Sequence, residues 1–298
     1  MLFRIHHATR FSYQKPAYQS HNEIRLTPRT SPRQRCLEFR LETNTGASVV
    51  EFRDWFGNVV HSVSMHQPHK EFQIVAESIV ERNPPRIDET AQLSFDRYLA
   101  DDASRTRNFY EFLSPTTYVP FSDRLRRFFW SARPDPHETV AEYVTRIVIF
   151  VRDQFGYEPG TTDAYSDVDQ MLSAGGGVCQ DFSHLTLGVL RLAGVPARYV
   201  SGYLAPDPNV GFAGEQATHA WLEAMLPDAG WTGFDPTHRG RTTDQHIRVA
   251  LGRDYSDATP LRGVFRSSGG NHSMSIDLKI ERLAADSTEF LKPGQSQQ

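Results

Sequence analysis

A run of three glycines that leads into a cysteine is the feature that most constrains this chain. Residues 175–177 are all glycine, Cys179 follows two positions later, and an apolar helical pattern then continues to Leu192. Gly194 and Pro196 come next, and glycine just past a helix with proline shortly after it is the usual sign of a C-terminus. The segment therefore predicts a buried helix that begins at Cys179.

The position of this cysteine permits two interpretations. A thiol in the first turn of a helix lies near the positive end of the backbone dipole, which favours the reactive thiolate. Most free cysteines, however, are simply small buried residues, so local evidence leaves both interpretations of Cys179 open. The other cysteine, Cys36, falls on the polar face of an expected strand, where a tolerated, partly exposed thiol is the simpler interpretation. Two cysteines in such different contexts exclude a disulfide scaffold and favour a reduced compartment.

Length and composition indicate how many domains the chain can form and which kinds of partner it can bind. The 298 residues suffice for two ordinary domains or one large one, and 39% apolar residues can build a core. A net charge of −4 gives no reason to expect a nucleic-acid partner. No apolar run is long enough for a signal peptide or a membrane span. We therefore expect a cytoplasmic protein without a membrane partner; the sequence leaves homo-oligomer formation open.

The chain is expected to divide into a β-rich first part and an α+β second part. Residues 1–83 contain several short strands, among them 37–41 with its alternating apolar side chains, which suggests a small β-sandwich. A proline pair at 84–85 marks the boundary, and residues 84–136 are expected to be a connection of loops and short helices. Residues 137–285 form the second part, and 286–298 a flexible polar tail.

The second part is expected to combine buried helices with an antiparallel sheet. A helix at 140–154 has apolar residues at helical spacing, and the helix that begins at Cys179 follows it. Three strands come next, at 197–204, 217–226 and 231–236, with hairpin connections. The alternating segment Met274–Leu283 is expected to be a strand that closes this same sheet.

A nucleophilic cysteine needs a base that takes its proton and a third group that orients the base. His219 begins the second strand and Asp235 ends the third. A hairpin centred on residues 228–229 would place His219 opposite about residue 238, so Asp235 needs a bulge or a short slip to reach it. The spacing permits a Cys179–His219–Asp235 constellation.

Four ordered motifs carry a resemblance to a known family. They are Gly177–Phe182, Gly194–Tyr203, Thr218–Trp221 and Gly233–Thr237. Together they resemble the bacterial transglutaminase-like family, and the resemblance implies a papain-like fold in which Cys179, His219 and Asp235 are the catalytic triad. Segments 25–29 and 54–58 are similar to the β-rich N-terminal domain that commonly precedes this core, and 244–255 to the segment that usually follows the triad.

The resulting fold prediction is α+β. A small N-terminal β-sandwich precedes a papain-like or transglutaminase-like core, with the catalytic Cys179 at the start of a buried helix that packs on an antiparallel sheet. No cluster resembles the calcium sites of animal transglutaminases, so calcium activation is not implied, and neither a metal nor a cofactor is expected. His66 and His69 have no ligand partners at suitable spacing and are expected in a surface loop. His184 is expected in the core or a pocket, and His238 is expected to line the cleft.

The implied chemistry is acyl transfer through a thioester on a peptide or protein amide. The backbone N–H of Cys179 would meet the oxyanion, and Tyr157, upstream of the cysteine helix, is the candidate for a second donor. Hydrolysis, as in a cysteine peptidase or amidase, is favoured. One alternative is a protein-glutamine transamidase with an amine acceptor, and another is a non-catalytic scaffold relative that binds a partner. A third alternative, a metal-dependent hydrolase, is not supported because the sequence offers no set of metal ligands.

Overall fold

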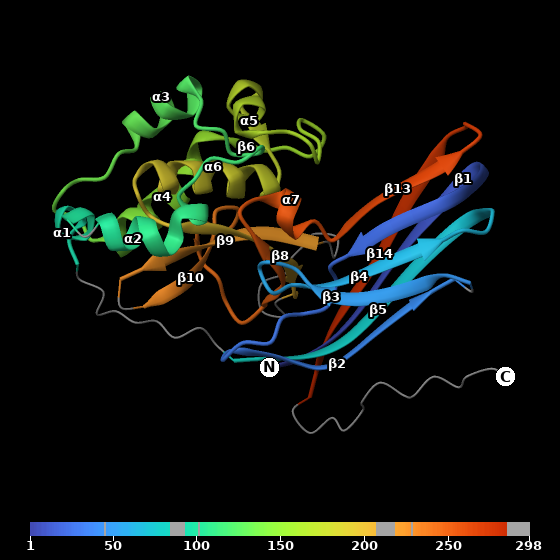
Figure 1. Ribbon diagram of the computed structural model, residues 1–298. Helices are drawn as coiled ribbons and strands as arrows, with labels where there is room; N and C mark the ends of the chain where they lie inside the picture. The colour runs from blue at the N-terminus through green and yellow to red at the C-terminus, as the bar shows by residue number, and fades with distance from the viewer. Residues whose placement is uncertain (45, 84–92, 101, 207–217, 228, 285–298) are drawn as a thin grey trace.

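A computed structural model describes residues 1–44, 46–83, 93–100, 102–206, 218–227 and 229–284. Strands from both ends of the chain form an elongated β-rich region, and helices cover a second sheet at the other end of the molecule (Figure 1). Among the described residues, no helix is both long and apolar enough to cross a membrane.

The β-rich region is a seven-stranded antiparallel sheet. Its strands are β1 (Leu2–Ile24), β2 (Gln34–Thr43), β3 (Ser48–Arg53), β4 (Val59–Met65), β5 (His69–Arg82), β13 (Leu261–Ser267) and β14 (His272–Leu283). The long β1 pairs with β5 and β14 along its first half, and with β4 and β13 along its second half. One hydrophobic cluster takes side chains from both β4 and β5, including Met65 and Phe72. The sheet thus curls around a shared core as a small sandwich in which β1 belongs to both layers.

The expectation that Met274–Leu283 closes the sheet of the second part is wrong. β14 pairs with β1 in unbroken register from Leu283 opposite Leu2 to His272 opposite Tyr13. Alternating apolar residues show that a strand has one buried face, but they do not say which sheet it joins. The β-rich region therefore contains strands from the range 137–285, in addition to those before residue 83.

The second part is built on a five-stranded antiparallel sheet in the order β11-β10-β9-β8-β12. The strands are β8 (Ala197–Leu204), β9 (Thr218–Leu226), β10 (Gly230–Asp235), β11 (Gly240–Arg241) and β12 (His246–Gly252). Helix α6 (Cys179–Leu192) packs on β8 and β9 on one side and on α3, α4 and α5 on the other. All its residues from Asp181 to Arg191 are buried. The predicted core, a cysteine-bearing buried helix on an antiparallel sheet, is confirmed.

The other helices surround α6. They are α1 (Phe95–Ala100), α2 (Asp102–Phe109), the 3₁₀ turn Tyr110–Phe112, α3 (Asp123–Ser131), α4 (Val140–Gln154), α5 (Val168–Ala174) and α7 (Tyr255–Ala258). Helix α4 begins where predicted because Thr139 and Glu142 form a capping box, in which each side chain accepts the other's backbone N–H. Its face with Val144, Ile147, Val148 and Val151 is buried against α6, as the spacing indicated.

The β-rich region and the core share an apolar cluster and a polar joint. Phe3, Ile5 and Leu278 pack against Tyr203 of β8 and Ile247 of β12. Other side chains of the β-rich region form hydrogen bonds with the backbone of β12. Gln34 bonds both the backbone N–H and the carbonyl of Arg248, at 2.9 and 2.7 Å, and Asn58 does the same for Leu251, at 2.8 and 2.7 Å. Strand β12 is therefore held by residues from the first part of the chain.

Candidate active site

The three glycines before Cys179 serve separate backbone needs. Gly175 ends α5 in the left-handed conformation, with φ of 78°, which glycine adopts without strain. Gly177 lies so close to Asp181 that an added Cβ would stand 2.6 Å from a carboxylate oxygen. That Asp181 oxygen accepts the backbone N–H of Val178 at 2.8 Å and fixes the first turn of α6. Cys179 is thereby presented, half-buried, at the N-terminal end of the buried helix.

Tyr157 lies beside this turn because of a short parallel pair of strands. β6 (Gly156–Tyr157) pairs with β7 (Gly176–Gly177), and Tyr157 stands opposite Gly177. Burial, followed by the charges of Cys179 and Asp235, raises the pKa of Tyr157, while a hydrogen bond from the Cys179 backbone acts in the opposite direction. The phenol therefore reaches the backbone N–H of the cysteine, where the sequence predicted a second oxyanion donor.

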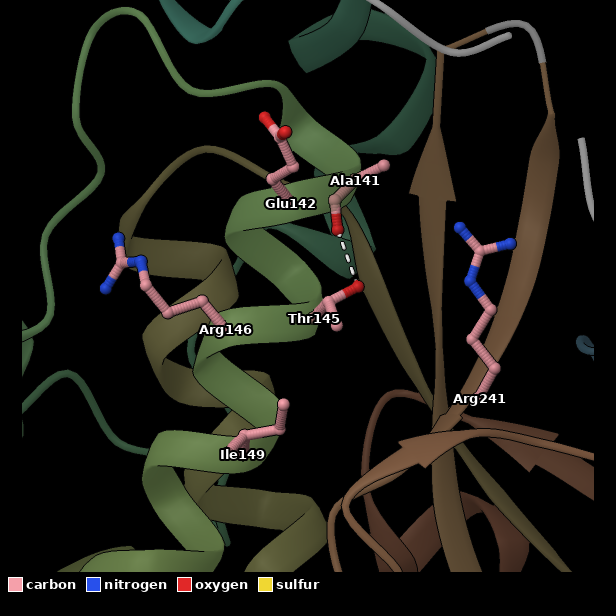
Figure 2. A pocket seen from close by; sticks show the side chains of 6 residues that line it. All are labelled: Ala141, Glu142, Thr145, Arg146, Ile149 and Arg241. Atoms are coloured by element: carbon pink, nitrogen blue, oxygen red, sulfur yellow. Dashed lines mark hydrogen bonds between the residues drawn. The ribbon is translucent and has the colours of Figure 1, made fainter. Parts of the chain in front are cut away.

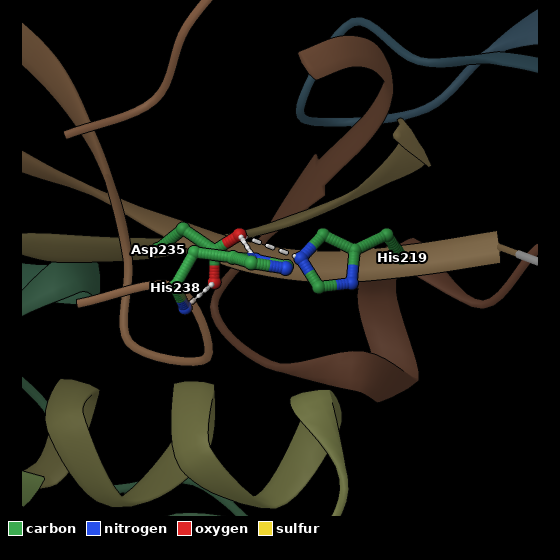
Figure 3. Close-up of side chains that lie close together, drawn as sticks. All are labelled: His219, Asp235 and His238. Carbon is green, nitrogen blue, oxygen red and sulfur yellow. Dashed lines mark hydrogen bonds and ion pairs between the residues drawn. The ribbon is translucent and has the colours of Figure 1, made fainter. Parts of the chain in front are cut away.

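His219 and Asp235 meet across two neighbouring strands (Figure 3). The His219 Nε2 lies 2.7 Å from Asp235 Oδ2. The pairing of β9 and β10 is regular from Gly230 opposite Leu226 to Phe234 opposite Leu222. Continued by one residue, this register places Asp235 opposite Trp221, so His219 is its diagonal neighbour on the same face, within reach of long side chains. The bulge or slip expected from the sequence is not needed.

The site stabilises a protonated imidazole. Burial alone would lower the pKa of His219, but the charge of Asp235, its hydrogen bond and a side-chain hydrogen bond with Cys179 outweigh it and raise the pKa to about 10. Burial would raise the pKa of Asp235, yet the charge of His219 and hydrogen bonds from three histidines hold it well below its usual value. Because Asp235 occupies Nε2 of His219, Nδ1 is the atom left for the thiol. The structure thus brings Cys179, His219, Asp235 and Tyr157 together.

Two further histidines contact the same carboxylate. His238 Nδ1 lies 2.7 Å and His246 Nε2 3.0 Å from Asp235 Oδ2, while the backbone N–H of Thr237 donates to Oδ1 at 2.9 Å. His238 was expected to line the cleft, and its side chain is 34% exposed beside His219. His246 was not predicted as a site residue, because a histidine at the start of a strand carries no periodic signal that links it to Asp235.

The arrangement of these groups fits hydrogen bonds better than metal ligation. The ligand atoms of His219, Asp235 and His238 lie within 4.8 Å of one another, the one such group among the described residues. Zinc bound to nitrogen and oxygen at about 2.0–2.1 Å keeps tetrahedral ligand atoms more than about 3 Å apart. The two nitrogens here lie 2.7 Å from one oxygen, which is a hydrogen-bond distance.

The other histidines singled out in the sequence lie elsewhere. His184 is buried on α6 and accepts the backbone N–H of Tyr255 at 3.1 Å, and burial lowers its pKa to about 3. His66 is exposed in the loop before β5, as expected, and packs on the ring of His21. His69 was also expected in that loop but begins β5 and contacts Ser20, so this pair does not form a shared site. Trp221 is buried and stacks on His219, with ring centroids 5.9 Å apart, as a core residue beside the base.

A hollow of about 460 Å³ lies between α4 and β11 (Figure 2). Its lining includes Thr145 and Ile149 on α4 and Arg241 on β11. The Thr145 hydroxyl donates to the Ala141 carbonyl within α4 at 2.8 Å, so it is already paired. None of the four predicted site residues lines this hollow. The candidate site is therefore defined by the convergence of side chains around Cys179.

Comparisons with known proteins match both parts of the chain. Residues 3–81 match the model of the bacterial transglutaminase-like N-terminal region, and residues 131–236 match that of the transglutaminase-like superfamily. An uncharacterized protein of Mycobacterium leprae is 36% identical over 94% of this chain and 99% of its own length. An uncharacterized protein of Mycobacterium tuberculosis is 31% identical over 95% and 94%.

Two comparisons concern proteins with a stated activity. A protein-glutamine gamma-glutamyltransferase of Pseudomonas aeruginosa is 33% identical over 47% of this chain, which corresponds to 22% of that protein. The crystal structure of a candidate cysteine protease from Cytophaga hutchinsonii superposes with a TM-score of 0.78 over 97% of this chain and 93% of that chain, at 22% identity. The second comparison shows that the two proteins share a fold.

Proposed function

Because this chain belongs to the transglutaminase-like superfamily, we propose that it catalyses cysteine-dependent acyl transfer on amide bonds, with Cys179, His219 and Asp235 as its catalytic triad. The observation that carries the proposal is the environment of His219. Its Nε2 is 2.7 Å from the buried Asp235, and a hydrogen bond with Cys179 contributes to a pKa of about 10. A base that is oriented on one side and contacts a thiol on the other is the arrangement that thiol catalysis requires.

The reaction begins with attack of the Cys179 sulfur on the amide carbonyl carbon. The new C–S bond forms as the carbonyl π electrons move to oxygen. When the oxyanion collapses, the C–N bond breaks, and protonated His219 gives its proton to the departing amine. The product is a thioester on Cys179. Asp235 keeps the imidazole in the orientation that allows both transfers, and remains ionised throughout.

Two donors are available for the oxyanion. The Cys179 backbone N–H begins α6, where the first N–H groups of a helix have no intrahelical partner. The Tyr157 hydroxyl already contacts this N–H, so an oxyanion that enters between them would accept from both. Tyr157 is 42% exposed, so a substrate can reach its side chain from solvent.

The acyl acceptor decides between two activities. With water, neutral His219 removes a proton as the oxygen attacks the thioester carbonyl carbon. The C–S bond then breaks, the carboxylic acid is released, and the free Cys179 sulfur and protonated His219 are restored. This hydrolytic reaction on a peptide or protein amide is the one we propose first. With an amine the same site would be a transamidase, and the similarity to the Pseudomonas aeruginosa protein-glutamine gamma-glutamyltransferase favours this second candidate.

A covalent trap tests the proposal. The protein is incubated with a library of peptide and glutaminyl amides, quenched in acid and digested, and adducts are located by mass spectrometry. We expect an acyl adduct on the peptide that contains Cys179, removable by hydroxylamine and absent from Cys179→Ala. Adding a primary amine before the quench distinguishes the acceptors, because a transamidase yields the amide of that amine.

The second thiol is a control within the same chain. Burial raises the pKa of Cys36 to about 11, so at neutral pH this residue remains a thiol and should carry no adduct. A Cys36→Ser variant should form the Cys179 adduct as the parent does. Equal modification of both cysteines, or adducts that do not require His219, would count against the triad.

A further inference from the structure

His246 is a buried histidine for which the proposed reaction has no direct use. Its side chain is 5% exposed at the start of β12, and its Nε2 lies 3.0 Å from Asp235 Oδ2. The ring also packs edge-on against Trp221, with centroids 5.2 Å apart. His246 therefore contacts the carboxylate and its apolar neighbour, but it stands behind Asp235 rather than beside the thiol.

The second ring nitrogen determines where the proton lies. The backbone N–H of Thr243 donates to His246 Nδ1 at 3.0 Å. A backbone N–H can only donate, so Nδ1 must be the unprotonated acceptor. The single proton of the neutral ring is then on Nε2 and points at Asp235. Burial, the largest influence, lowers the pKa of His246, which agrees with a neutral ring.

The loop that supplies this N–H is attached to the β-rich region. The carbonyl of Thr243 accepts a hydrogen bond from the Arg82 guanidinium at 3.3 Å, and Arg82 is the last residue of β5. On the other side of His246, Ile247 is buried in the cluster with Phe3 and Ile5. The chain on both sides of His246 is therefore held by residues from the first part of the sequence.

We propose that His246 is a positioning residue, a neutral Nε2–H donor that holds the Asp235 carboxylate toward His219 and is itself held by the β-rich region through Thr243. This inference rests on the proposed function, because it assigns a role within the same triad. It also gives the N-terminal sheet an indirect role in the chemistry: Arg82 holds the loop whose Thr243 N–H fixes the tautomer of a histidine that bonds the catalytic carboxylate. His238 differs, since its side chain contacts the same oxygen but is 34% exposed.

The first test observes the His246 ring directly in the parent protein. Long-range ¹H–¹⁵N spectra of the protein with labelled histidine report the protonation of both ring nitrogens, and loss of signals in His246→Gln assigns the residue. We expect a neutral Nε2–H tautomer at pH 7. A ring protonated on Nδ1, or on both nitrogens, would overturn the inference even if the triad is correct.

The second test compares three variants by the rate at which iodoacetamide labels Cys179 at pH 6. His246→Phe keeps a ring but removes both hydrogen bonds, and labelling should slow about tenfold, as expected for loss of a hydrogen bond to a charged group. His246→Gln can accept from Thr243 and donate to Asp235, so it should restore most of the rate. His7→Phe removes another buried histidine, one that bonds Tyr203 at 2.9 Å, and should label as the parent does.

The outcomes separate this inference from the proposed function. If Cys179 of the parent is labelled rapidly and this depends on His219, but the rate is unchanged in His246→Phe, the positioning role is wrong and the triad is still supported. If Cys179 of the parent is labelled slowly and the rate does not depend on His219, both the triad and the positioning role are wrong. If His246→Gln is as slow as His246→Phe although both variants are folded, the donor role is wrong.

Discussion

Replacing Asp235 with asparagine should lower the pKa of His219, so that its imidazole is no longer protonated at neutral pH. The carboxylate accepts from His219, His238 and His246 on Oδ2 and from the Thr237 backbone on Oδ1. An asparagine side chain presents one oxygen and one NH₂ group, so in either orientation a donor faces a donor. The charge that overcomes the burial of His219 is also lost.

The size of this effect follows from the pKa of His219. A value of about 10 against 6.5 for a free imidazole corresponds to about 5 kcal/mol in favour of the protonated ring. Because the folded-state pKa is raised, this stabilisation is complete below pH 6.5 and is lost as the pH rises toward 10. Breaking a buried ion pair typically costs about 3–5 kcal/mol of stability, which is consistent with the value from the pKa of His219. We therefore expect Asp235→Asn to lose about 3–5 kcal/mol at pH 6 and progressively less toward pH 10.

Two assays check this. Urea unfolding at pH 6 and pH 9.5 measures the difference in unfolding free energy, and NMR of histidine labelled at Cε1 follows the titration of His219. The parent should keep His219 protonated beyond pH 9, and the variant should be neutral at pH 7. Asp254→Asn, which removes another buried carboxylate, one beside His184, should leave the titration of His219 unchanged. Titration of parental His219 near pH 6.5, or a stability loss that does not depend on pH, would show that Asp235 does not hold His219 in its protonated form.

Three other substitutions test separate parts of the account. Tyr157→Phe should lower kcat about 10²-fold on the substrate found by thioester trapping, without changing alkylation of Cys179, because only the oxyanion loses a donor. Gly177→Ala places a Cβ 2.6 Å from the Asp181 carboxylate, and thermal unfolding should show a loss of about 1–3 kcal/mol. Glu223→Gln removes the buried charge that pairs with Arg198 at 2.6 Å, and urea unfolding should show a loss of about 3–5 kcal/mol.

Much of the core was predictable because its signals are local. The glycine run and the apolar spacing of α4 each depend on residues a few positions apart. The hairpin of β9 and β10 was also within reach, since its turn nearly fixes the register. His219 and Asp235 then follow from strand ends that lie on one face.

What the sequence did not reveal depends on long-range pairing. β14 alternates as any half-buried strand does, and its pairing with β1 connects residues about as far apart as the chain allows. The contact of His246 with Asp235 requires β12 to lie at the sheet edge next to β8, an order that no local pattern encodes. The Gln34 and Asn58 bonds to β12 likewise join positions that are remote in sequence.

The proposed triad depends above all on the activation of Cys179 by His219. Its most direct test is the rate of iodoacetamide labelling at pH 6, read separately for Cys179 and Cys36 by mass spectrometry in the parent and in His219→Ala. We expect rapid labelling of Cys179 in the parent and a fall of at least about tenfold at Cys179 in the variant. Cys36, whose pKa burial raises to about 11, should be labelled slowly in both proteins. Labelling of Cys179 at the same slow rate in both proteins would contradict this activation.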